Sequence, residues 1–130
     1  MTRVSKRTNR AAAPTAALQR HMQRFLEVRQ ELAQIQPFCK ASVLKRTITC
    51  GRAQCACHSD RAKRHGPYTQ MTYKANGKTV GRFLSPEAAP LYLDAARQYR
   101  KLKTLLRDLD KISKAILVQQ AKLAESKSQN

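Results

Sequence analysis

The sequence predicts an α+β protein. An N-terminal helix and a long C-terminal helix pair as a helical hairpin or coiled coil, with a small central antiparallel β-sheet and a Cys/His loop at the tip. Three observations predict this class. Apolar residues recur at heptad spacing towards both ends of the chain, the middle alternates β-branched and polar residues around an Asn-Gly pair, and three of the four cysteines cluster with two of the three histidines just before that pair.

The first third of the chain predicts a basic arm followed by a helix. Residues 1–13 show no apolar period and are expected to form a flexible basic arm. A helix is predicted over 14–36, because Pro14 suits a first helical turn and Pro37 is expected to end the helix. Within it an apolar residue recurs every seven positions, at Leu18, Phe25 and Leu32.

The middle of the chain predicts three strands. Residues 41–50 are rich in β-branched side chains and alternate roughly, which favours a strand. Further strands are predicted over 68–75 and 78–84, because they flank Asn76-Gly77. Both central positions of a type I′ turn need a positive φ, which Asn and Gly tolerate best, so a tight hairpin is expected here.

A long helix is predicted near the C-terminus. Ser85 and Pro86 are typical of a helix start, but Pro90 is awkward for one helix running on from Pro86. We therefore expect a short turn over 86–89 and a helix over 91–124. An apolar stripe with a seven-residue period supports the helix, at Leu102, Leu109, Ile116 and Leu123.

These elements predict one domain over 14–124, with the β and Cys/His segment at 41–84 between the two helices, and a frayed tail over 125–130. The second helix is longer than the first by about ten residues, or about 15 Å. The excess apolar stripe has no obvious partner within the chain. A homodimer through the helices would bury it.

Positive charge dominates the composition. The chain has 26 Lys and Arg against 8 Asp and Glu, a net charge of +18, which predicts a polyanionic partner such as nucleic acid. Hydrophobic residues make up 42% of the chain, which favours a folded protein over a disordered one. No apolar run is long enough to span a membrane, and the N-terminus lacks the apolar region of a secretory signal. A cytoplasmic protein is expected, associated with the nucleoid if it binds DNA.

The cysteine cluster predicts a structural zinc site. Cys50, Cys55 and Cys57 supply three thiols, and their clustered spacing favours a metal over a disulfide framework. His65, His58 or Cys39 could supply the fourth ligand. His65 is preferred because seven intervening residues let the chain loop back. A reduced cysteine cluster without metal, and a redox or nucleophilic cysteine, remain as other interpretations.

Enzymatic activity is not expected. Asp60 is the only acid between Glu31 and Glu87, so a nucleophilic cysteine with a histidine base would have almost no carboxylate to orient that base. The same scarcity argues against a two-metal nuclease, which needs several carboxylates.

The segment Arg46–Phe83 resembles a bacterial and archaeal family of small uncharacterised proteins. The shared pattern is R-x-I-x-C-G-x-x-x-C-x-C, then H-G-P-Y, then a hairpin containing G-K-T, and it covers about a third of the chain. The resemblance marks His65, rather than His58 or Cys39, as the motif histidine. Members are found in genomes rich in mobile elements, which implies a role as an accessory to a recombinase or transposase. Many members have a second aromatic residue where this chain has Thr69.

The segment 37–85 is a candidate nucleic-acid interface. It holds ten Lys or Arg and a single acid, for a net charge of +9. Tyr68 and Tyr73 could stack on bases, but they fall on opposite faces of one strand, so at least one is expected in the core. The candidate nucleic-acid-binding residues are Lys40, Lys45, Arg46, Arg52, Arg61, Lys63, Arg64, Tyr68, Lys74, Lys78 and Arg82.

The sequence thus predicts a small, zinc-stabilised, non-enzymatic protein that binds nucleic acid, DNA in preference to RNA. The second interpretation is an adaptor whose long helix docks on a partner protein, with the charge serving solubility. The third is a small thiol-dependent enzyme.

Overall fold

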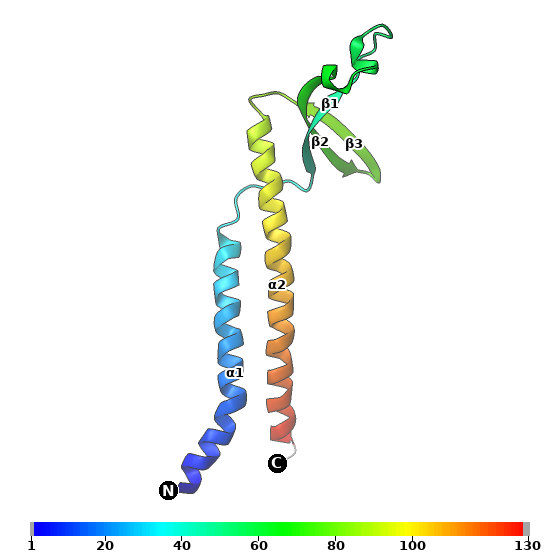
Figure 1. Ribbon diagram of the computed structural model, residues 1–130. Helices are drawn as coiled ribbons and strands as arrows, with labels where there is room; N and C mark the ends of the chain where they lie inside the picture. The colour runs from blue at the N-terminus through cyan, green and yellow to red at the C-terminus, as the bar shows by residue number, and fades with distance from the viewer. Residues whose placement is uncertain (1, 129–130) are drawn as a thin grey trace. The chain divides into compact units, whose positions relative to one another are not determined.

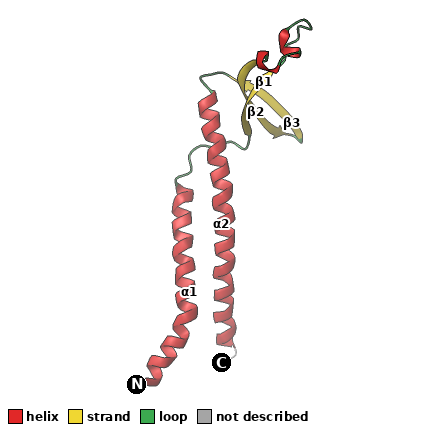
Figure 2. Cartoon of the chain, in the orientation of Figure 1, coloured by secondary structure: helices red, strands yellow, loops and turns green. Residues whose placement is uncertain are grey.

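A computed structural model describes residues 2–128, with side chains from residue 16 onward. The chain divides into two compact units (Figure 1). The helical unit comprises residues up to Ile35 together with residues from Lys101 onward, and the sheet unit comprises Gln36–Arg100. Figure 2 shows helices and strands in the predicted order, which confirms the α+β class. The elements are α1 (Thr2–Ala33), β1 (Ser42–Ile48), the 3₁₀ turns η1 (Ala56–His58) and η2 (Arg61–Lys63), β2 (His65–Ala75), β3 (Lys78–Leu84) and α2 (Ala89–Ser128).

Helix α1 is longer at its start than the predicted helix. It begins at Thr2, so it runs through residues 2–13 of the predicted flexible basic arm, and Pro14 lies inside it, while residue 1 lies outside the described residues. The segment contains Ala, Arg and Lys, which favour helix, and a proline inside a helix removes one backbone hydrogen bond. The helix ends at Ala33, three residues before the predicted end.

Helix α2 is longer at both ends than the predicted helix. The Ser85 hydroxyl accepts a hydrogen bond from the backbone N–H of Ala88 at 3.2 Å, as a capping residue does. Pro90 then falls in the first turn of α2, where a missing N–H costs nothing, so the helix begins at Ala89. It continues to Ser128, through residues 125–128 of the predicted frayed tail, whereas residues 129–130 lie outside the described residues.

The helical unit buries the predicted apolar stripes in part. Its two helical segments run in opposite directions (Figure 1). Val28 is fully buried in α1, and Leu105 and Ile116 are buried in α2. The heptad positions are all buried or half-buried: Leu18, Phe25 and Leu32 in α1, and Leu102, Leu109, Ile116 and Leu123 in α2.

The sheet unit contains a three-stranded antiparallel sheet in the order β1-β2-β3. The hairpin prediction is confirmed, because Asn76 and Gly77 both have a positive φ, of 52° and 77°. One face of the sheet packs on the first turns of α2, where Val43, Met71 and Ala96 form the core. Tyr73 and Leu84 pack beside them, with Ala41 and Leu93.

Among the described helices, none combines the length and the apolar composition that crossing a bilayer requires.

Candidate metal centre and basic surface

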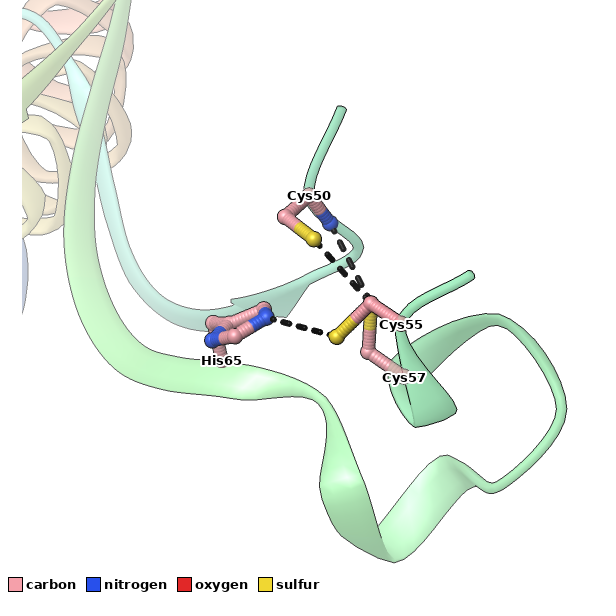
Figure 3. Close-up of side chains that lie close together, drawn as sticks. All are labelled: Cys50, Cys55, Cys57 and His65. Carbon is pink, nitrogen blue, oxygen red and sulfur yellow. Dashed lines mark hydrogen bonds between the residues drawn. The ribbon is translucent and has the colours of Figure 1, made fainter. Parts of the chain in front are cut away.

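Four predicted ligands come together at one end of the sheet (Figure 3). Cys50 lies just after β1, Cys55 directly precedes η1, and Cys57 lies within η1. His65 is the first residue of β2, which begins three residues earlier than predicted. It pairs with Ile48 across the β1–β2 ladder, so strand pairing carries the histidine back to the cysteines.

The distances within the cluster fit a tetrahedral metal site. Tetrahedral zinc, with bonds of about 2.3 Å to sulfur and about 2.0 Å to nitrogen, separates its ligand atoms by about 3.8 Å for S···S and about 3.5 Å for S···N. The Sγ atoms of Cys57 and Cys50 are 3.7 Å apart, and Cys55 Sγ lies 3.5 Å from His65 Nε2. All four donor atoms lie within 4.8 Å of one another. The cluster could therefore hold a metal ion, and its donor set is compatible with zinc.

The surroundings of the thiols differ. Cys57 is only 2% exposed, whereas the other ligands remain partly accessible. A hydrogen bond from the Cys57 backbone, followed by the His65 side chain, lowers the pKa of Cys55 from its usual 9.0 to about 6. The Cys50 backbone N–H, which donates to Cys57 Sγ at 3.3 Å, lowers the pKa of Cys57. Desolvation and the neighbouring sulfurs outweigh that bond, so the pKa of Cys57 is raised.

The two other candidate ligands lie outside the cluster. His58 follows Cys57 directly, but its Nε2 lies 2.8 Å from the carbonyl oxygen of Arg52. Cys39 precedes β1, and its backbone N–H donates to Ala95 of α2. Both residues are absent from the set of converging donor atoms. The structure thus brings His65 to the three cysteines, as preferred from the sequence.

A glycine beside the cluster allows β2 to begin where it does. Gly66 has a φ of +109°, which an L side chain rarely adopts. A Cβ there would lie 2.8 Å from the backbone N of Tyr68 and 3.0 Å from the carbonyl oxygen of Arg46. Any other residue at this position would therefore force the backbone of β1 or β2 to move.

The ten basic residues of 37–85 are all exposed, and among the described residues none of them forms an ion pair. The single acid, Asp60, accepts a hydrogen bond from the Ala62 backbone and caps η2. By strand register, Lys45 and Arg82 share the face of Val43 and Met71. Arg46 and Lys74 lie on the opposite face. Four others lie in the segment between β1 and β2, which we call the Cys/His loop: Arg52, Arg61, Lys63 and Arg64.

The structure separates the two tyrosines as the alternation predicted. Tyr73 packs on the core, whereas Tyr68 is 44% exposed and contacts Phe83. Sequence reasoning missed Phe83 and Arg97. Arg97 lines an open cleft with Lys45, and only the packing of α2 on the sheet reveals that proximity. The exposure of Phe83 could have been inferred from its alternation with Leu84 along β3.

A family model for a domain of unknown function, DUF6788, matches residues 15–93, which is more than half of the chain. The chain belongs to the DUF6788 family. The segment matched to DUF6788 includes all four clustered ligands, the three strands and the start of α2. No curated protein and no solved structure matches the chain.

Proposed function

We propose that this protein is a non-enzymatic nucleic-acid-binding protein in which structural zinc holds a basic sheet unit in shape. One observation carries the proposal: the ten basic residues of 37–85 are exposed and lack ion-pair partners among the described residues. So many uncompensated positive charges repel one another unless a polyanion neutralises them. The phosphate groups of a nucleic acid supply that neutralisation whatever its base sequence. We expect DNA to be bound in preference to RNA.

Zinc is the metal that best suits the cluster. Three thiols and one imidazole are the donors of a common structural zinc set, and four protein ligands complete a tetrahedral shell. The Cys50 N–H bond to Cys57 Sγ is the kind of contact that orients a ligand around a metal. A closed shell leaves no position for substrate, so the metal would stabilise the loop rather than catalyse.

The geometry gives less support to a thiol-dependent enzyme. Cys55 and His65 are close enough to act as a nucleophile and its base. However, the carboxylate of Asp60 is used in capping η2, and among the described residues no acid contacts His65. The imidazole would therefore lack the third group that orients a catalytic base.

A salt titration tests nucleic-acid binding. Anisotropy of labelled mixed-sequence DNA, as duplex and as single strand, should show an affinity that falls steeply and log-linearly as salt rises. Replacing one basic side chain that binds a phosphate should reduce the slope by about one. Binding that is absent for both DNA forms, or insensitive to salt, would contradict the proposal.

The second candidate function is a helical adaptor. It is favoured by Leu106, Leu117 and Val118 of α2, which are 51%, 60% and 52% exposed. A protein partner, such as a recombinase or transposase, or a second copy of this chain would cover them. If the protein binds a protein partner through these residues but binds no DNA, the adaptor function is correct and the nucleic-acid proposal is wrong.

A further inference from the structure

The face of the sheet that points away from the α2 core carries apolar, aromatic and basic side chains. Strand register places Arg46 opposite Tyr68, and Leu44 opposite Gln70, which in turn is opposite Phe83. These five residues define the outer sheet face. The neighbouring positions along β1 and β2 that point to the other face include the buried core residues Val43 and Met71.

The apolar side chains of the outer sheet face are open to solvent. Leu44 is 63% exposed, Phe83 is 50% exposed and Tyr68 is 44% exposed. The two aromatic rings lie 5.8 Å apart between centroids, with their planes 67° to one another. They form a corner, so that a flat ring stacked on one of them would meet the other edge-on.

The outer sheet face is also positively charged. The Arg46 guanidinium donates to the Gln70 side-chain oxygen at 2.9 Å, which holds it beside the aromatic corner. Lys74 lies further along the same face of β2. The three strands contain no acidic residue, so no carboxylate on the sheet would repel a phosphate.

We propose that the outer sheet face binds single-stranded nucleic acid, with unpaired bases stacked on Tyr68 and Phe83 and phosphates contacted by Arg46 and Lys74. Exposed aromatic faces beside basic side chains are the combination that single strands recognise. In a duplex the flat faces of the bases are covered by their neighbours, so the rings could not reach them. This inference rests on the proposed nucleic-acid binding and adds which form of nucleic acid is preferred.

The test compares two substitutions of one ring. Phe83→Leu keeps an apolar side chain but removes the aromatic face, whereas Phe83→Trp enlarges that face. The probe is a fluorescein-labelled oligothymidylate of about 16 nucleotides, and the competitor is mixed-sequence duplex DNA. Wild type should bind the single strand more tightly than the duplex. Phe83→Leu should weaken single-strand binding about ten-fold, and Phe83→Trp should preserve it.

Leu44→Ala is the matched control on the same face. A leucine offers no stacking surface. If stacking dominates, Leu44→Ala should therefore change single-strand affinity less than about two-fold, as an ordinary surface substitution does. Circular dichroism and metal content of each variant establish that the fold is intact. If Phe83→Leu and wild type bind single strands equally while both still bind DNA, the inference is wrong and the proposed function stands.

Two further results would also overturn the inference. If the protein binds duplex more tightly than single strand, its basic residues contact duplex phosphates and the aromatic rings do not stack on bases. A molar mass that halves in both Phe83→Leu and Leu44→Ala would show that a second copy of the chain covers this face. Absence of binding to every nucleic acid would instead contradict the proposed function itself.

Discussion

At the scale of single residues, the candidate metal centre depends on how each donor is held. Cys57 is buried within η1 and receives the Cys50 backbone N–H, whereas His65 is held by strand pairing. Without the metal, the buried Cys57 sulfur would lose its bonding partner. The loop around it has almost no core of its own, so it would lose stability. Cys57 should therefore be the least replaceable of the four ligands.

Cys57→Ser should abolish stoichiometric metal binding and lower the free energy of unfolding by more than about 4 kcal/mol, since losing a structural metal is among the most costly single changes. Metal analysis and urea unfolding measure these effects. Cys39→Ser is the matched control because Cys39 lies outside the cluster, and it should retain the metal. Full metal content in Cys57→Ser would contradict the assignment.

Cys55 should be reactive when the metal is removed. Its pKa is lowered to about 6, so above that pH the metal-free protein carries a thiolate there. The rate of Cys55 alkylation by iodoacetamide should rise with a midpoint near pH 6 rather than near 9. Added zinc should suppress it, because the sulfur is then coordinated. Peptide mass spectrometry follows Cys55 and Cys39 separately, and equal zinc protection of both thiols would contradict the prediction.

Gly66 and Gly77 form a matched pair, because both have a positive φ but only Gly66 is crowded. Gly77→Ala should cost about 1 kcal/mol of unfolding free energy, from backbone strain alone. Gly66→Ala adds a clash between the new Cβ and the backbone of Tyr68 and Arg46, so it should lower the free energy of unfolding by about 3 kcal/mol. It should also weaken metal binding through the neighbouring His65. Urea unfolding and metal titration compare them, and equal costs would show that the strands move apart easily.

At the scale of elements, α2 presents two kinds of apolar residue within the helical unit. Leu105 and Ile116 are buried, but their neighbours Leu106 and Leu117 are exposed. Leu106 and Leu117 are eleven residues apart, about three helical turns, so they share one face. The sequence predicted a homodimer through the heptad stripe of this helix, whereas the exposed face is that of Leu106 and Leu117, so a homodimer through these residues would cover it.

The substitutions Ile116→Ala and Leu117→Glu should separate folding from association. Ile116→Ala opens a cavity and should cost about 2–4 kcal/mol of unfolding free energy. Leu117→Glu places a charge on an exposed position, so helix content should persist while the molar mass falls from dimer to monomer. Light scattering and circular dichroism measure these quantities. A wild-type protein that is monomeric at high concentration would contradict the dimer.

At the scale of the whole molecule, the net charge of +18 raises the question of whether DNA binding depends on the total charge or on where the basic residues lie. Two triple variants remove the same charge. The first replaces Arg61, Lys63 and Arg64 of the Cys/His loop with alanine, and the second replaces Lys111, Lys122 and Lys127 of α2. The loop variant should reduce the salt slope of DNA binding by about three, and the helix variant by less than one. Equal reductions would indicate that only total charge matters.

The sequence by itself determined the local features of this protein. Heptad spacing predicted the buried faces of both helices, and Asn76-Gly77 predicted the hairpin, because periodicity and turn geometry depend on residues close together in the chain. Cysteine spacing predicted three ligands for the same reason. Helix ends were less predictable, because a proline is tolerated in a first turn without cost, as at Pro90, and inside a helix at a cost that other interactions offset, as at Pro14.

Only the tertiary structure decided which distant residues meet. Pairing of Ile48 with His65 brought the fourth candidate ligand to the three cysteines, and the register of β2 against β3 placed Tyr68 beside Phe83 on an open face. The packing of α2 on the other face partly buried Tyr73 and brought Arg97 and Lys45 to the same cleft. Such contacts depend on strand register and on packing between segments far apart in the sequence, and a one-residue change in register would reverse which face each side chain occupies.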